Sequence, residues 1–273
     1  MKPIPFCDLS RAHAPIAQAL QRAMVGCLDR STFLRGSEAL AFDEEWAAYC
    51  GQAHAVCCNS GTDALTLGAM VLGIKTAAVQ SNTLPLTAIG LYRGGSRVCL
   101  QEVGSDGWMI NAPAAPKAGL AGPDSTPEPV PVLMFGQLPP PGAQGARFLD
   151  QWLAERQFIG ERYNCRLRPM GIALSGDTLH HLYVVRVPAR DSLVTFLAIR
   201  GIGSKVHWAT ALHQQPGPWE AMGRYEQAER WCASVLSLPC FPGLRSDEID
   251  RTCDAIEAWF SGHQKETVCT VNA

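Results

Sequence analysis

Two segments rich in proline and glycine interrupt this chain of 273 residues. Residues 111–129 hold five prolines in nineteen positions, and residues 136–146 read GQLPPPGAQGA. Because proline has no backbone N–H and a fixed φ angle, a regular helix is excluded from such segments. The sequence therefore predicts two folded parts, residues 1–145 and 146–262, followed by a tail at 263–273.

Short apolar runs alternate with helical patterns in the first part. Helices are predicted over 10–28, 38–50 and 62–72, and the last two end at Gly51 and Gly73. Four apolar runs are predicted as short buried strands: 55–58, 77–79, 97–100 and 130–135. Strands that alternate with helices are typical of a parallel α/β sheet.

The second part has its own pattern. A helix is predicted to carry Phe148, Trp152 and Tyr163 on its apolar face, and a strand is predicted over 181–187. Three further helices are predicted over 191–200, 225–236 and 246–260. This part is expected to form a second, smaller α/β domain.

The composition excludes several classes of protein. Lys and Arg number 23 against 25 Asp and Glu, and no basic run occurs, so we expect no nucleic-acid partner. No stretch approaches the roughly 18 apolar residues of a membrane span. The first residues, MKPIPFCDLS, lack the apolar region of a signal peptide, so a cytoplasmic protein without membrane association is expected. The 11 cysteines include no C-x-x-C pair, which predicts no metal site.

A candidate anion site lies between the first predicted strand and its helix. Ser60, Gly61 and Thr62 supply hydroxyls and backbone N–H groups at a helix N-terminus, which attracts phosphate. Thr83, after the next strand, is predicted to approach the same site. The alternative is that Ser60 or Thr62 merely caps the helix.

Several blocks of sequence follow one another in the order seen in a known family. They include PFCDLS, FLRGSEALAFDEEWAAYCG and NSGTDAL in the first part, and LDQWLAERQFIGERYN, RGIGSKVHWATALHQQP and VLSLPCFP in the second. Together they resemble the DegT/StrS family of nucleotide-sugar aminotransferases. The resemblance implies the fold-type-I architecture of a large and a smaller α/β domain, a homodimer, and amino transfer from glutamate to a keto sugar through pyridoxal phosphate (PLP).

One stretch of that family has no counterpart in this chain. In active relatives a segment like residues 132–137 leads to the Asp that pairs with the PLP ring nitrogen and to the Lys that binds PLP covalently. Here ten residues rich in Pro and Gly follow Gln137, and the aromatic that stacks on the ring and a family His are replaced by Leu84 and Leu133. None of the five lysines stands in a matching context: Lys2, Lys75, Lys117, Lys205 and Lys265. We therefore expect no PLP cofactor and no transamination by this chain alone.

The missing stretch also changes the expected sheet. By the resemblance it carries three strands that separate the first predicted strand, 55–58, from the fourth, 130–135. If these two close up side by side, a truncated, mainly parallel sheet of four strands in the order 3-2-4-1 results.

Two histidines are the candidate acid–base groups. His207 and His213 align with a family pattern that borders the substrate site, and with Lys205 and Glu220 they could form a polar cluster. The alternative is that they only hold a loop. His180 and His181 point to opposite faces of a strand and are poor joint metal ligands.

Three functions remain open from the sequence. The chain could be a non-catalytic partner in nucleotide-sugar or natural-product biosynthesis, pairing with itself or with an intact aminotransferase homologue. It could instead be a PLP-free enzyme that uses His207 and His213 in the old cleft, or an inactive gene remnant. In the first two cases a phosphate or a nucleotide sugar is the expected ligand.

Overall fold

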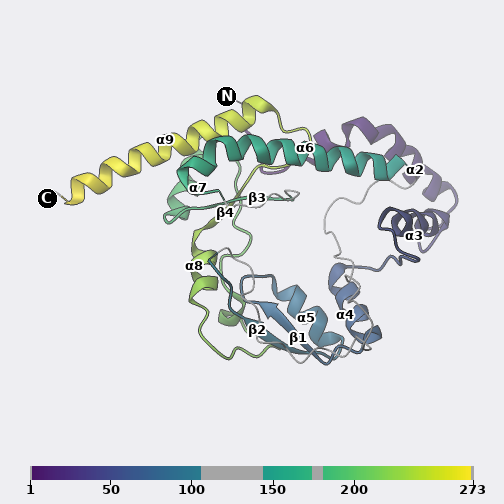
Figure 1. Cartoon of the computed structure of the whole chain (residues 1–273). Coiled ribbons are helices and arrows are strands. Elements are labelled where there is room, and N and C mark those ends of the chain that lie inside the picture. Colours follow the sequence, from purple (N-terminus) through teal and green to yellow (C-terminus); the bar gives the residue numbers. More distant parts are fainter. Residues whose placement is uncertain (1, 106–143, 174–180, 272–273) are drawn as a thin grey trace. The chain divides into compact units, whose positions relative to one another are not determined.

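The computed structural model describes residues 2–105, 144–173 and 181–271 (Figure 1). The chain divides into two compact units. Unit 1 comprises residues 1–57, 138–207 and 235–273, and unit 2 comprises residues 58–137 and 208–234. These units do not coincide with the predicted parts 1–145 and 146–262.

Contacts of the N-terminal segment explain the difference. Ile4, 1% exposed, donates its N–H to the Gly201 carbonyl over 2.8 Å and accepts from Gly203 over 2.8 Å. Arg11 binds Glu248, a residue 237 positions away along the chain. Local sequence patterns carry no signal for such distant pairing, so the sequence alone does not indicate that this segment packs within unit 1.

Unit 1 is a mainly helical layer on a small antiparallel sheet. Strands β3 (Tyr183–Arg186) and β4 (Val235–Leu238) pair with Tyr183 opposite Leu238. Helices α6 (Gln144–Leu167) and α9 (Ser246–Val271) run side by side (Figure 1) and are joined by the ion pair Arg162–Asp250 at 2.6 Å. The other helices are α1 (Leu9–His13), η1 (Ala14–Ile16), α2 (Ala17–Asp29), α3 (Ser37–Tyr49), η2 (Arg168–Met170) and α7 (Arg190–Ile199).

A continuous apolar core holds unit 1 together. Residues from the N-terminal segment, α6, both strands, α7 and α9 contribute to it, including Ile4, Tyr163, Val185, Leu197 and Ile256. The rings of Tyr163 and Tyr183 lie 4.6 Å apart, and the Tyr163 hydroxyl donates to the Pro239 carbonyl over 3.1 Å. The buried hydroxyl therefore has the partner that its burial requires.

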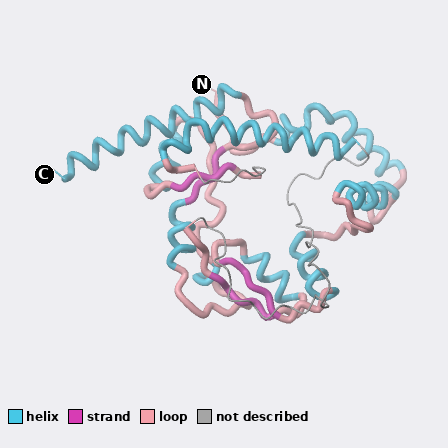
Figure 2. The backbone as a smooth tube through the Cα atoms, in the orientation of Figure 1, coloured by secondary structure: helices cyan, strands magenta, loops and turns pink. Residues whose placement is uncertain are grey.

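Unit 2 is built on two parallel strands covered by helices (Figure 2). Strands β1 (Thr76–Gln80) and β2 (Arg97–Gln101) pair with each other, and Thr76 lies opposite Arg97. Helices α4 (Gly61–Val71) and α5 (Pro85–Arg93) pack closely against each other. At their contact, a Cβ added to Gly90 would lie only 2.7 Å from the Thr62 carbonyl oxygen. Residues 208–234 add η3 (Leu212–Gln214) and α8 (Glu226–Ser234).

The predicted sheet order 3-2-4-1 is wrong at its first strand. Residues 55–58 form no strand, and Val56 is 73% exposed. The second and third predicted strands do pair in parallel, as β1 and β2. The fourth, 130–135, lies outside the described residues. An apolar run becomes a strand only where a neighbouring strand pairs with its backbone. Among the described residues no strand pairs with 55–58, and the Cys57 N–H donates to an Asp43 carboxylate oxygen over 2.8 Å instead.

Two helix predictions also needed correction. The expected helix 225–236 ends at Ser234, and the buried residues Val235–Leu238 form β4 instead. The expected helix 10–28 is divided by the 3-10 turn Ala14–Ile16, in which Pro15 removes a backbone donor. Within the ranges that the structure describes, no helix is long and apolar enough to cross a lipid bilayer.

Candidate functional site

The N-terminus of α4 has the capped geometry predicted as one alternative. Ser60 is the N-cap in an extended conformation, and its hydroxyl oxygen accepts from the Asp63 N–H over 3.1 Å. The same hydroxyl lies 2.9 Å from an Asp63 carboxylate oxygen. Ser60 therefore caps the helix, and its hydroxyl is engaged within the chain.

A carboxylate of the chain occupies the first turn of this helix. Asp63 accepts from Ser60 and from the Asn59 amide, and Arg93 lies 3.4 Å away. The Ser60 hydrogen bond, with smaller contributions from Asn59 and Arg93, lowers the pKa of Asp63 against a small opposing effect of burial. Since the positive helix end already holds an anion, a second anion meets repulsion there.

Gly61, Thr62 and Thr83 complete the predicted anion site. Gly61 is buried, Thr62 is half-buried, and both belong to the first turn of α4, where N–H groups have no carbonyl of the same helix to bond. Thr83 lies in the turn between β1 and α5. Helix α5, which Thr83 precedes, packs against α4.

Phosphate binding at this site is expected to be weak and to depend on Thr62. Each neutral hydrogen bond contributes about 1 kcal/mol net, so a Kd nearer millimolar than micromolar is expected. Thr62→Val should weaken binding several-fold in calorimetry with inorganic phosphate. Thr66→Val is the control, because its hydroxyl bonds the Thr62 and Gly90 carbonyls instead. If the wild type and Thr62→Val bound phosphate with equal affinity, helix capping would be the only role left for Ser60 and Thr62.

Lys75 lies at the opposite end of α4 from this site. It is exposed and immediately precedes β1, whereas Ser60 precedes α4. The 11 residues of α4 rise about 1.5 Å each, so about 15 Å of helix separate the two ends. Lys2 and Lys205 belong to unit 1, and Lys117 and the side chain of Lys265 lie outside the described residues.

His213 belongs to a chain of hydrogen bonds in unit 2. Its Nδ1 lies 2.7 Å from Ser81 Oγ, and its Nε2 lies 2.9 Å from Glu229 Oε1. The imidazole also stacks on the Tyr225 ring, with centroids 4.4 Å apart. Ser81 and Glu229 were not identified from the sequence. The one local signal is that Ser81 ends a parallel strand, where the ligands of α/β proteins bind.

His207 has a separate environment in unit 1. Its Nδ1 lies 2.9 Å from Ser237 Oγ, and its ring is 5.6 Å from that of Phe6. Burial lowers the pKa of His207, and the nearby Lys205 and His181 lower it further. The expected cluster thus divides into two pairs: Lys205 and His207 in unit 1, and His213 and Glu220 in unit 2.

Other expected groups have ordinary roles. Glu220 binds Arg97 through two hydrogen bonds of 2.7 and 2.5 Å. His180 and Leu133 lie outside the described residues. Across the part of the chain that the structure describes, no three His, Cys, Asp or Glu side chains are grouped so as to hold a metal ion.

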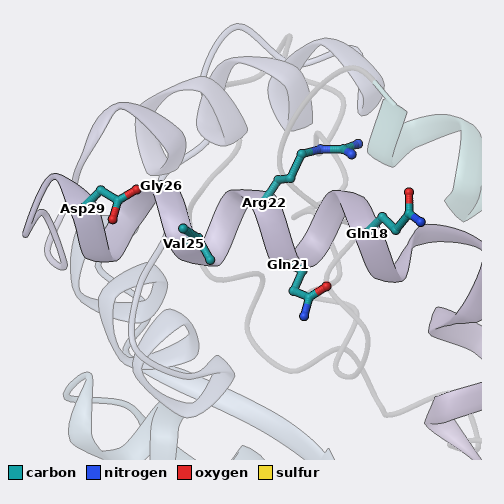
Figure 3. A pocket seen from close by; sticks show the side chains of 6 residues that line it. All are labelled: Gln18, Gln21, Arg22, Val25, Gly26 and Asp29. Carbon is teal, nitrogen blue, oxygen red and sulfur yellow. The ribbon is translucent and has the colours of Figure 1, made fainter.

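A surface hollow of about 530 Å³ lies along α2 (Figure 3), and none of these groups lines it. All six residues that line it belong to that one helix: Gln18, Gln21, Arg22, Val25, Gly26 and Asp29. A second hollow, of about 370 Å³, lies between α2 and α3. The second hollow holds Ser37, whose hydroxyl donates to Glu38 over 3.1 Å, but that carboxylate is also paired with Arg30 and is therefore a poor base.

Comparisons with known proteins connect the whole chain to one family. The chain is 23% identical to the erythromycin biosynthesis sensory transduction protein EryC1 of Saccharopolyspora erythraea, over 93% of this chain and 99% of the relative. It is 24% identical to the dTDP-3-amino-3,4,6-trideoxy-alpha-D-glucose transaminase of Streptomyces venezuelae, over 94% and 96%. The alignment to EryC1 spans 362 positions. It is therefore longer than this chain, and part of the relative has no counterpart here.

Solved structures show the same architecture. DesV of S. venezuelae matches 95% of this chain and 99% of its own with a TM-score of 0.75 at 22% identity. An aminotransferase of Brucella abortus matches 94% and 99% with a TM-score of 0.73 at 19% identity. The fold is thus the α/β fold of the fold-type-I aminotransferases.

The family model for the DegT/DnrJ/EryC1/StrS aminotransferases matches residues 15–118 and 145–257. Its interruption falls on the two segments rich in proline and glycine. With most of the residues matched and the fold shared, the chain belongs to the DegT/DnrJ/EryC1/StrS aminotransferase family.

Proposed function

We propose that this chain does not transaminate by itself and acts as a partner protein in nucleotide-sugar or natural-product biosynthesis. The observation that carries the proposal is the gap: the family match stops at residue 118 and resumes at 145, and the alignment to EryC1 is longer than the chain. By the resemblance, the missing stretch holds the lysine and the aspartate that bind PLP.

The residues at the carboxyl edge of β1 do not fit PLP. The lysine nearest in sequence, Lys75, lies at the start of β1, and Asp63 places a negative charge in the first turn of α4 that weakens the attraction for a phosphate. The side chain at the position of the stacking aromatic is Leu84, which is 45% exposed. A charge-assisted bond to the ring nitrogen contributes about 1.5–3 kcal/mol and ring stacking about 0.5–1.5 kcal/mol, so their loss alone weakens PLP binding strongly.

Exposed apolar helix faces support the role of a partner protein. Helix α2 buries none of its residues, and Met24, Val25 and Leu28 are 68%, 50% and 63% exposed. On α4, Leu67, Met70 and Val71 repeat at helical spacing and are 51%, 59% and 84% exposed. Grouped apolar side chains of this kind mark protein interaction sites. The packed core of unit 1, meanwhile, is not what a decaying gene product would be expected to keep.

The chain is expected to form a dimer with itself or with an intact homologue from the same source. Light scattering over a range of concentrations, on the chain alone and on the mixture, measures this directly. Met24→Glu and Val71→Glu should each weaken the dimer at least about tenfold, because a charge in an apolar interface costs more than about 1.4 kcal/mol.

Ile199→Glu is the matched control. Ile199 is 78% exposed on α7, outside both apolar faces, so the substitution should leave association unchanged. A monomer at every concentration, both alone and with the homologue, would refute the proposal.

A further inference from the structure

Ser81, His213 and Glu229 form a continuous hydrogen-bonded chain in unit 2. The distances, 2.7 Å from Ser81 Oγ to His213 Nδ1 and 2.9 Å from His213 Nε2 to Glu229 Oε1, are those of strong hydrogen bonds. A hydroxyl within reach of an imidazole that a carboxylate orients is the arrangement that activates a nucleophile. We infer that Ser81 is a nucleophile, His213 its general base and Glu229 the residue that positions His213, in a site for small carboxylic esters. This activity goes beyond the proposed partner function.

The hydrogen bonds favour one tautomer of the imidazole for the proposed base. A carboxylate accepts hydrogen bonds, so an imidazole that acts as a base donates from Nε2 to Glu229 and accepts from the Ser81 hydroxyl at Nδ1. In the well-known serine hydrolases the two ring nitrogens have the opposite partners. Either ring nitrogen can take a proton. The hydrogen bonds therefore run in the same order as in those enzymes, from hydroxyl to imidazole to carboxylate.

The surrounding backbone holds the three groups in place. The Ser81 N–H donates to the Gln101 carbonyl over 2.9 Å, and the Ser81 carbonyl accepts from the Leu212 N–H over 2.6 Å. Glu102 accepts from two N–H groups at the start of α8, at 2.9 and 3.0 Å, and so anchors the helix that carries Glu229. A site held in this way needs little reorganisation before reaction.

The location agrees with a catalytic role. Ser81 is the first residue after β1, in a turn that leads into α5. The same order of strand, turn and helix exposes the nucleophile of the α/β hydrolases at the carboxyl end of a parallel strand. In open α/β sheets this is the edge at which ligands bind.

Burial limits the substrate. Ser81 is 0% exposed, and the side chains of His213 and Glu229 are 13% and 47% exposed. Solvent thus reaches the Glu229 carboxylate most freely and the Ser81 hydroxyl least. A reagent must enter a covered site, so short acyl groups are expected to react and long ones to be excluded.

The reaction balances with water as the second substrate. Ser81 Oγ attacks the ester carbonyl carbon while its proton passes to His213 Nδ1. The bond to the alcohol oxygen then breaks, and the alcohol leaves with that proton. Water next attacks the acyl-serine and gives one proton to His213, which returns it to Ser81 Oγ as the carboxylic acid leaves.

Hydrolysis of p-nitrophenyl acetate by the full chain tests the inference. Ser81→Ala and His213→Gln should each lower the rate about a thousandfold, and the double variant no further, because the two residues act as one unit. Ser96→Ala is the matched control, since Ser96 is 3% exposed in the same unit and its hydroxyl donates to the Ile74 carbonyl. The octanoate ester should react at least about tenfold more slowly than the acetate.

Covalent labelling provides a second readout, independent of turnover. Methanesulfonyl fluoride, a reagent small enough for a covered site, should modify Ser81, located by peptide mass spectrometry, in the wild type and in Ser96→Ala but not in His213→Gln. Glu229→Ala should slow labelling, and Glu229→Asp should partly restore it, whereas a merely structural contact would affect melting and not labelling.

Each alternative outcome decides the question. Wild-type hydrolysis in a folded Ser81→Ala variant, or no label on Ser81 with circular dichroism unchanged, would overturn the inference. Neither result bears on the partner function, which is measured by light scattering on variants of α2 and α4.

Discussion

Incubation of the purified protein with PLP, followed by borohydride, is expected to leave none of the five lysines modified at a stoichiometric level. The family resemblance places the reactive lysine in a stretch that this chain does not have, and the alignment to EryC1 is longer than the chain. Without a covalent bond and a carboxylate for the ring nitrogen, neither retention of the cofactor nor its use as an electron sink is expected. Transamination should therefore not exceed the rate of free PLP in solution.

Peptide mass spectrometry after reduction measures the first result, and amino transfer from glutamate to a keto sugar nucleotide measures the second. The transaminase of Streptomyces venezuelae, a 24% identical relative, is the positive control. A reduced PLP adduct on Lys2, Lys75, Lys117, Lys205 or Lys265, formed at a stoichiometric level, would contradict the prediction.

Glu248→Gln is expected to lower the free energy of unfolding by about 3 kcal/mol at pH 7. Glu248 is 1% exposed and accepts from Arg11 at 2.7 and 3.1 Å and from the Arg245 N–H at 3.0 Å. The neutral amide would take from Arg11, whose side chain is 27% exposed, its buried counter-charge and leave it the partly exposed Asp8 carboxylate at 3.1 Å. Because Arg11 is in α1 and Glu248 in α9, the ion pair joins two helices of unit 1 that are far apart along the sequence.

The effect should depend on pH in a defined direction. Burial alone would raise the pKa of Glu248, but the hydrogen bonds and charges of Arg11 and Arg245 hold it below its ordinary value. A lowered pKa contributes stability above the unfolded pKa of about 4.3, and this contribution is lost as the pH falls through the folded pKa. The difference between wild type and Glu248→Gln should therefore shrink in acid.

Urea unfolding at pH 7 and at pH values below 4 measures both effects. Asp247→Asn is the control: its side chain is 62% exposed and pairs with Arg245, so the loss should stay within about 1 kcal/mol. An equal loss for both variants at pH 7 would show that burial of Glu248 does not matter.

The sequence by itself determined the elements whose signals are local. Helices α3, α4 and α7 begin and end within one or two residues of the predicted positions, and Gly51, Gly73 and Gly201 follow them with φ angles of 66°, 61° and 69°. Glycine adopts such angles at little energetic cost, so a glycine after a helical pattern predicts where the helix ends. Family membership was also readable, because its blocks are continuous in sequence.

Only the tertiary structure decided which distant segments meet. The apolar run 55–58 is no strand, whereas Val235 and Leu236, predicted to end a helix, belong to β4 and pair with β3. Strand formation depends on a partner elsewhere in the chain, so a short apolar run does not identify itself. Ser81 and His213 are 132 residues apart and each looks ordinary in its own context; they form a site because the fold brings the end of β1 to η3.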